Sequence, residues 1–382
     1  MKTIILTLLT TFCIFSQMQS KVIVKVSNPC NFDRKNELVE LSIAAISKKI
    51  SLNDSQTFLV EDESGTVIPS QLTYDNKLIF SCDLKAKAST RFTIIAGNPR
   101  HYAPQVFGAY LPQRKDDFVW ENDRVGFRFY GDSLKYSDGP SNGMDLWYKR
   151  TSAMVLQKWY ENALKKGIWF HTDRGEGCDA YAVGRSLGAG AMAPCIDGNL
   201  ILNDNFLKPE ILDDGPLRFT ARLIYPDFQV NGNSILESRT VSLDAGSQLT
   251  AITENYGDCH FPVAAGIVKR LNEDSTVVDL KSNYFIYAEP KTKENGAVFL
   301  GVYLPNGLKS VYTASYSTEN PVNHQVSKFT HTLGISQYQS RPFTYYTGFG
   351  WEKFGFPSIR SFEEYMKRFV RQKEHPLKVK YL

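Results

Sequence analysis

The chain has 382 residues, of which 42% are hydrophobic and 13% aromatic, and it carries a formal net charge of +4. This length predicts about two domains. The charges are interspersed, without the block of lysines and arginines that marks nucleic-acid binding, so we exclude nucleic acid as a partner. The many tyrosines and tryptophans suit a sugar-binding cleft, because each offers a flat apolar face with a polar handle, but they equally suit strand packing.

The first twenty residues have the pattern of a secretory signal peptide. Lys2 is followed by an apolar run from Ile4 to Phe15 and then by small polar residues up to Ser20. The apolar run is too short to span a bilayer. We therefore predict that residues 1–20 are a signal peptide, and that the mature protein is periplasmic or secreted and does not insert into the membrane.

The mature chain keeps an odd number of cysteines, namely Cys30, Cys82, Cys178, Cys195 and Cys259. Export permits disulfides, but sequence alone does not fix their pairing. Two pairings fit the predicted organisation, Cys30 with Cys82 and Cys178 with Cys195. The alternative is five buried free thiols.

Residues 21–98 predict a small β-sandwich. Short strand-like runs separated by polar turns lie at 22–26, 38–41, 57–60, 78–80 and 92–95. Residues 99–115 contain three prolines and little periodicity, so we predict a linker there.

Residues 116–382 predict a large antiparallel sandwich with few helices. Apolar residues alternate over 125–129, which indicates a half-buried strand. Asp244–Ser247 predicts a tight hairpin. Helices are expected at 153–166 and at 358–371, where Ser361 and Glu364 have the spacing of a capping box.

The segment 169–190 carries the densest set of chemically useful side chains. Five glycines interrupt it, so it is neither a regular helix nor a core strand. We predict a structured loop that holds acids, bases and an aromatic ring toward a ligand; the alternative is a solvated surface loop. It contains no standard metal-ligand or nucleophile spacing, so we expect no metal and no cofactor. The candidate catalytic residues in it are His171, Asp173, Glu176, Asp179, Tyr181 and Arg185.

Further candidates for substrate binding lie outside this loop. A carboxylate, an indole and two cations occur together at Asp145, Trp147, Lys149 and Arg150, which would suit a charged sugar or, alternatively, keep an exposed edge strand soluble. Glu121 precedes the strand predicted at 125–129, Arg174 offers a cation from the loop, and Trp351 would stack on a sugar or pack in the core.

The motifs WENDRVGFRFYG, HTDRGEGCDAYAVGRSLGAG and VSLDAGSQLTAI resemble an exported bacterial family, a domain of unknown function from polysaccharide-utilisation loci. The resemblance spans most of the mature chain. It implies a mostly β fold, with a small N-terminal β-sandwich followed by a large galactose-mutarotase-like β-supersandwich, and a sugar as substrate. His260 and Glu289 occupy places similar to those of the mutarotase acid and base, although residues 258–262 depart from the mutarotase motif.

These observations favour an exported carbohydrate-active enzyme that degrades oligosaccharides containing uronic acid. A lyase would use an arginine against the uronate carboxylate, with His171, Tyr181 or His260 for proton transfer. A hydrolase would use two carboxyl groups on either side of the scissile bond. The alternatives are a mutarotase or epimerase acting through His260 and Glu289, and a glycan-binding protein without catalysis.

Overall fold

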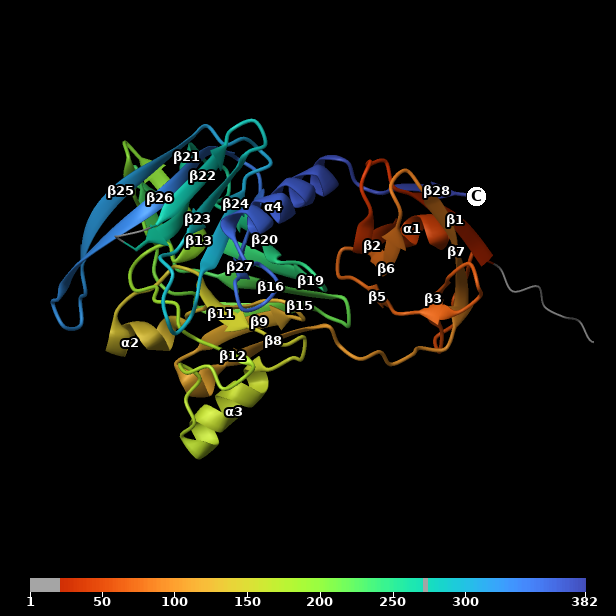
Figure 1. Ribbon diagram of the computed structural model, residues 1–382, viewed down its shortest axis with the longest axis horizontal. Coiled ribbons are helices and arrows are strands. Elements are labelled where there is room, and N and C mark those ends of the chain that lie inside the picture. Colours follow the sequence, from red (N-terminus) through yellow and green to blue (C-terminus); the bar gives the residue numbers. More distant parts are fainter. Residues whose placement is uncertain (1–20, 271–273) are drawn as a thin grey trace, which may run out of the picture.

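The computed structural model describes residues 21–270 and 274–382, so the predicted signal peptide lies outside the described residues. The described chain forms a small N-terminal part and a larger part beside it (Figure 1). Every ladder between named strands in these residues is antiparallel. The predicted mostly β fold with a C-terminal helix is therefore confirmed.

The N-terminal part consists of two facing sheets around their own core. One sheet has the order β28-β1-β7-β3-β4 and the other β2-β6-β5. Alternate residues of each strand, among them Val24, Leu41, Val60, Phe80 and Ile94, fill the space between the sheets. The elements are β1 (Lys21–Ser27), β2 (Arg34–Ser42), α1 (Ile43–Ile46), β3 (Thr57–Glu61), β4 (Val67–Ile68), β5 (Ser70–Leu72), β6 (Lys77–Leu84) and β7 (Ser89–Gly97).

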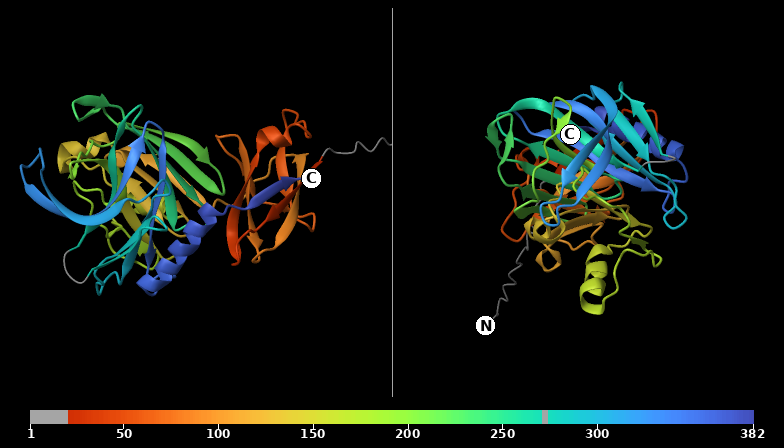
Figure 2. Two further views of the ribbon diagram at one scale, coloured as in Figure 1. Left: turned by 90° about the horizontal axis from the view of Figure 1, so that it is seen from above. Right: turned by 90° about the vertical axis from the view of Figure 1, so that its left-hand side faces the viewer.

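The end of the chain returns to this first sheet. Strand β28 (Lys378–Tyr381) pairs with β1, with Tyr381 opposite Val24, and Val379 packs on the N-terminal core. The predicted large part, residues 116–382, therefore gives its last strand to the small part (Figure 2, left). Four residues with alternating lysines are too short a pattern to be recognised without the partner strand.

The large part contains three main sheets that share one apolar core. Their orders are β12-β11-β10-β9-β8, β14-β13-β21-β26-β25 and β15-β16-β19-β20-β27-β24-β23-β22. The strands of the first sheet are β8 (Val106–Leu111), β9 (Asp117–Asn122), β10 (Gly126–Phe129), β11 (Asp145–Lys149) and β12 (Gly177–Cys178).

The strands of the second sheet are β13 (Ala189–Ile196), β14 (Asn199–Leu200), β21 (His260–Lys269), β25 (Ser310–Glu319) and β26 (Val326–Gln339). Those of the third are β15 (Lys208–Asp214), β16 (Arg218–Ile224), β19 (Ser238–Asp244), β20 (Leu249–Asn255), β22 (Ser275–Asp279), β23 (Tyr284–Ala288), β24 (Val298–Tyr303) and β27 (Phe343–Trp351). A separate hairpin joins β17 (Phe228–Val230) and β18 (Asn233–Ile235). The predicted hairpin at Asp244–Ser247 connects β19 to β20.

Two predictions about the entry to the large part are corrected. The predicted linker contains β8, which pairs along its whole length with β9. Strand β10 is buried on both faces rather than half-buried. Its phenylalanines enter the main core, and its other face is covered by a second cluster that includes helix α3 (Leu156–Lys166), which lies within the helix expected at 153–166.

The C-terminal helix α4 (Ile359–Glu374) lies on the outer face of β23 and β24, with Phe362, Met366 and Phe369 buried. Its cap is Ser358 rather than the predicted Ser361. Ser358 has an extended backbone and accepts a hydrogen bond from the Ser361 amide at 3.2 Å, so Ser361 takes the third helical position.

Neither predicted disulfide is formed. All five cysteines of the described residues are free thiols, four of them buried and Cys259 half-buried. Cys178 contacts Asn295, whereas Cys195 contacts the Tyr312 hydroxyl, so the members of that predicted pair lie in different surroundings.

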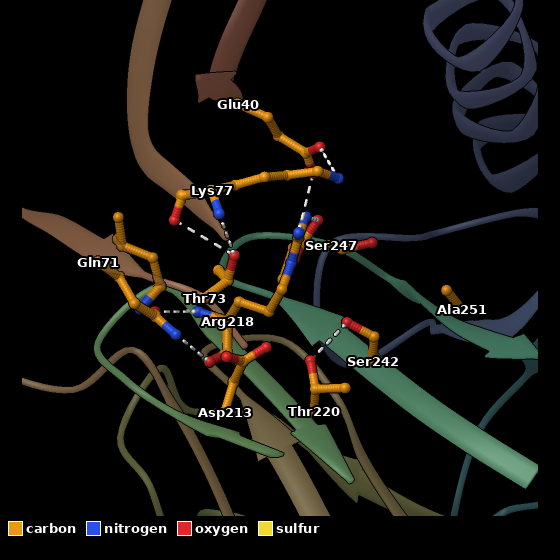
Figure 3. Close-up of polar contacts among 12 residues, drawn as sticks. Glu40, Gln71, Thr73, Lys77, Asp213, Arg218, Thr220, Ser242, Ser247 and Ala251 are labelled. Carbon is orange, nitrogen blue, oxygen red and sulfur yellow. Dashed lines mark hydrogen bonds and ion pairs between the residues drawn. The ribbon is translucent and has the colours of Figure 1, made fainter. Parts of the chain in front are cut away.

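A glutamine of the small part joins it to the large part (Figure 3). The Gln71 Oε1 atom accepts hydrogen bonds from the Leu217 and Arg218 amides at 3.0 and 2.9 Å, and its Nε2 donates to the Arg218 carbonyl at 2.9 Å. Nearby, Asp213 accepts from the Tyr74 amide at 2.7 Å. Polar contacts therefore fix this junction.

We expect Gln71→Ala to destabilise the protein by about 2 kcal/mol or more, because it leaves backbone groups without partners at a buried junction. Urea unfolding of the full chain measures the loss. Gln229→Ala, at an exposed glutamine of β17, is the matched control. Equal unfolding curves for the two variants would show that Gln71 does not hold the junction.

Candidate functional site

The loop predicted at 169–190 leaves the end of α3 and joins the first sheet through β12. Gly177 pairs with Lys149 at φ +122°, and a Cβ atom there would lie 1.8 Å from the Tyr148 carbonyl oxygen. Only glycine permits both this backbone conformation and this close approach. The loop is thereby divided into an outer portion beside α3 and an inner portion that enters the protein.

The inner portion contributes Asp179 to a buried charge network. The Arg128 guanidinium of β10 lies 3.0 Å from Asp179 and 3.5 Å from Asp117 of β9, and it is also hydrogen-bonded to Asp145 of β11. The three carboxylates are between 0% and 3% exposed. One cation therefore holds carboxylates from two strands and a loop in the interior.

This surplus of carboxylates affects their protonation. Burial raises the pKa of Asp145 to about 7 and also raises the pKa of Asp117, against the attraction of Arg128. The Tyr130 hydroxyl donates to Asp145 at 3.0 Å and accepts from Arg128 at 3.2 Å. Burial raises the pKa of Tyr130 well above its ordinary value, so its phenol keeps its proton.

His171 lies on the solvent side of this network. Its Nδ1 is 3.1 Å from the Asp179 carbonyl oxygen and 3.7 Å from the Asp179 carboxylate, and its side chain is 60% exposed. Because a carbonyl oxygen only accepts, this hydrogen bond places the proton on Nδ1 and leaves Nε2 with a free lone pair. The exposed imidazole is thus oriented as a proton acceptor.

A pocket of 380 Å³ lies between α3 and the outer portion of the loop; Phe170 and Thr172, the chain neighbours of His171, line it, and His171 itself does not. Trp169, which is 44% exposed, lines it, and the indole stacks parallel to the His171 ring at 6.3 Å. Arg114 lies 5.8 Å from the centre of the same indole. The charged and aromatic lining residues are Lys158, Trp159, Lys166, Trp169, Phe170, Arg174 and Glu176.

The charges of this pocket are mostly positive. Its acid, Glu176, is bound by Lys158 at 2.5 Å and by the Trp159 indole at 3.2 Å. The hydrogen bond from Lys158 lowers the Glu176 pKa, so Glu176 does not serve as a proton donor. Lys166 and Arg174 remain to meet an anionic ligand on an aromatic surface.

Several predicted site residues hold the local structure. Asp173 accepts from the amides of Gly175 and Gly177 at 2.8 and 3.1 Å and pairs with Arg150 at 3.0 Å, which fixes the turn. Although burial raises it, the pKa of Asp173 is lowered overall by these amides.

Glu121 and Lys149 form a fully buried pair rather than part of an exposed edge strand. Glu121 also accepts from the first amides of α3, at Val155 and Leu156, with distances of 2.8 and 2.7 Å. Trp147 stacks within the same cluster and is fully buried. These side chains hold α3 against the sheet and do not reach solvent.

The other predicted residues lie apart from His171. The Tyr181 hydroxyl donates to the Gly188 carbonyl, Arg185 lies 3.9 Å from Asp204, and Trp351 is buried with its indole bound to the Asn295 carbonyl. His260 begins β21 and contacts Ser340.

Glu289 contacts the Tyr148 hydroxyl at 3.2 Å and Arg270 at 3.4 Å. Arg270 follows the end of β21, whereas His260 stands at its start, so a ten-residue strand of about 30 Å separates Glu289 from His260.

Arg128, Tyr130 and Trp169 were not among the predicted site residues. The sequence did contain a signal for Arg128, because it lies between Phe127 and Phe129 of one strand. A cation in such a buried strand needs buried polar partners. No signal for Tyr130 existed, because its role depends on Asp145 across the sheet. Within the described residues, no group of three or more histidine, cysteine, aspartate or glutamate side chains is arranged to hold a metal ion.

Comparison with known proteins places this chain among related sequences. It is 25% identical over 386 residues to a Formosa agariphila protein described as uncharacterized protein P7, a match that covers 94% of this chain and 92% of the relative. Two solved structures from Enterococcus faecalis are similar at 8% identity: a protein in glycosyl hydrolase family 38 (TM-score 0.49) and an alpha-mannosidase (TM-score 0.48).

Each of these two alignments covers 95% of this chain, which spans about half the length of either solved protein (47% and 46%). At 8% identity and TM-scores below 0.5, this similarity establishes neither a shared fold nor a shared activity. The model of a family described as a domain of unknown function (DUF4861) matches residues 26–379. The chain therefore belongs to the DUF4861 family.

Proposed function

We propose that the protein is a carbohydrate-active enzyme that cleaves oligosaccharides containing uronic acid, by a lyase reaction at His171. The observation that carries this proposal is the exposed imidazole with its proton fixed on Nδ1, beside a pocket lined by an indole and cations. The basic lining matches a carboxylate-bearing sugar, and the free Nε2 matches a base for an acidic carbon-bound proton.

Substrate binding is assigned to the pocket between α3 and the loop. The exposed face of Trp169 would stack on a sugar ring, and Arg174 is in position to pair with the uronate carboxylate. Pairing with a cation makes the proton at C5 of the uronate more acidic, which is the chemical requirement for its removal.

The reaction needs one base and one acid. His171 Nε2 takes the C5 proton, the electron pair forms the C4–C5 double bond, and the bond between C4 and the leaving oxygen breaks. The leaving oxygen takes its proton from solvent water, because the Tyr130 phenol lies inside the buried network, bound to Asp145 and Arg128. The contact between Arg128 and Asp179 positions the base, since the Asp179 carbonyl binds His171.

A hydrolase is disfavoured by burial. Two carboxyl groups would have to flank the scissile bond. Asp117, Asp145 and Asp179 are at most 3% exposed, and Glu176 is bound by Lys158. A mutarotase acting through His260 and Glu289 is disfavoured because His260 starts β21, whereas Glu289 contacts Arg270 just past the other end of that strand.

Export to the periplasm or the medium is part of the proposal and rests on the sequence of residues 1–20. An extracytoplasmic enzyme of this kind would meet its polymer substrate directly. Proteomic detection of the protein in periplasmic and medium fractions of its native host tests this point.

His171→Ala should lower turnover of a uronic-acid oligosaccharide about 100-fold or more, because the base is lost. Ultraviolet absorbance of the unsaturated product, followed together with reducing ends, measures it. His260→Ala, also an exposed histidine, should keep full activity. Reducing ends without absorbance would identify a hydrolase instead, and binding without turnover a glycan-binding protein.

Trp169→Ala should raise KM about tenfold, equivalent to about 1.4 kcal/mol, with a smaller change in kcat, because the ring contacts substrate away from the reacting carbon. Steady-state kinetics on the same oligosaccharide measure both constants. Tyr136→Ala removes another exposed aromatic ring and is the control. An unchanged KM for Trp169→Ala would place the sugar elsewhere.

The Asp145 carboxyl predicts a pH dependence of stability. Its pKa is about 7 in the folded protein and near 3.8 when exposed, so the folded protein holds a proton that the unfolded chain has released. The wild type should therefore lose stability relative to Asp145→Asn as the pH rises from about 4 to about 7. Urea unfolding of both proteins across this pH range measures the difference in their free energies of unfolding. A difference that stays constant with pH would contradict the prediction.

A further inference from the structure

The largest cavity among the described pockets lies at the junction of the two parts of the molecule, away from His171. It has a volume of 540 Å³ and is walled by β2 on one side and by α4 on the other. A second hollow of 300 Å³ continues it over the eight-stranded sheet, and the two share lining residues that include Glu40, Arg218 and Tyr346. We call the two together the junction groove.

The groove exists because the outer face of the sheet is only partly covered. Helix α4 lies over β23 and β24, and the small part contacts the sheet near Arg218 of β16 (Figures 1 and 3). Most outward side chains of β19, β20 and β27 between these two covers are small, although Tyr346 of β27 borders them. Ser242, Ala251, Thr253 and Thr344 form this floor.

The floor and wall offer hydroxyl groups next to aromatic rings. The Thr253 and Thr344 hydroxyls lie 2.7 Å apart, and Ser242 lies 3.1 Å from Thr220. Tyr346 borders the floor and stacks on Tyr303 at 5.9 Å between ring centres. The Lys373 ammonium group lies 5.0 Å from the Tyr346 ring and limits the groove on the α4 side.

The charges around the groove balance. Its cations are Lys35, Lys77, Arg218 and Lys373, and its acids are Glu37, Glu40, Asp75 and Asp244. Glu40 binds Arg218 at 2.8 Å and Lys77 at 2.6 Å (Figure 3). Arg218 also binds Asp244 at 2.5 Å. A strongly charged ligand would have to break these pairs, whereas a neutral one would not.

We propose that the junction groove is a second sugar site, which binds a neutral, polyhydroxylated oligosaccharide. Hydroxyl groups that both donate and accept match those of a neutral sugar. The Tyr346 ring beside them is held by Tyr303, Phe369 and Lys373 and borders the groove. The site differs in ligand class from the basic pocket beside Trp169. Together the two would hold a polysaccharide that contains neutral and acidic units.

Isothermal titration of the full chain with cellohexaose, mannohexaose and xylohexaose, and with hexagalacturonate for comparison, tests the proposal. At least one neutral hexasaccharide should bind. Ala251→Phe, which fills the floor, should weaken that binding at least tenfold, and Thr344→Val, which removes one hydroxyl group, should weaken it several-fold. Thr313→Phe, on the exposed strand β25, is the matched control and should bind normally.

The proposal for the groove and the proposal for the lyase reaction can be contradicted independently of each other. His171→Ala should retain groove binding, and Ala251→Phe should retain turnover of short uronic-acid oligosaccharides. The proposal is overturned if no neutral hexasaccharide binds at millimolar concentration, or if Ala251→Phe binds as the wild type does. It is also overturned if Ala251→Phe abolishes the binding of hexagalacturonate instead of the binding of a neutral hexasaccharide.

Discussion

The contact between Arg128 and Asp179 is the interaction on which the candidate site depends. It joins a strand in the middle of the first sheet to a glycine-rich loop that has little regular structure of its own. The Asp179 carbonyl then orients His171 at the surface. A buried ion pair contributes little net stability, but removing one partner leaves an unpaired charge, so the pair fixes one arrangement of the loop.

Beside α3, too, buried polar groups position residues at the surface. Glu121 is buried against Lys149 and also binds the first amides of the helix, which places Trp159 and the wall of the neighbouring pocket. The side chains that meet solvent, Trp169 and Arg174, come from the loop instead. The buried carboxylates thus hold the loop and the helix in place, while this ring and this cation stay exposed at the pocket.

The junction between the two parts combines covalent and polar restraints. Both described ends of the chain lie in the small part, because β28 pairs with β1. Gln71 and Arg218 add hydrogen bonds and ion pairs across the contact. A junction fixed in this way preserves the open groove beside it, which a sliding interface would close.

The sequence by itself determined the mostly β class, many of the strands, the position of the C-terminal helix and the irregular backbone of the loop at 169–190, since these depend on local periodicity and glycine content. Only the tertiary structure decided which polar residues of the loop act together. Asp179 binds both Arg128 and His171, whereas Tyr181 and Arg185 have other partners. Which polar side chains contact each other depends on the packing of strands that are far apart in the chain, and no local sequence pattern encodes this packing.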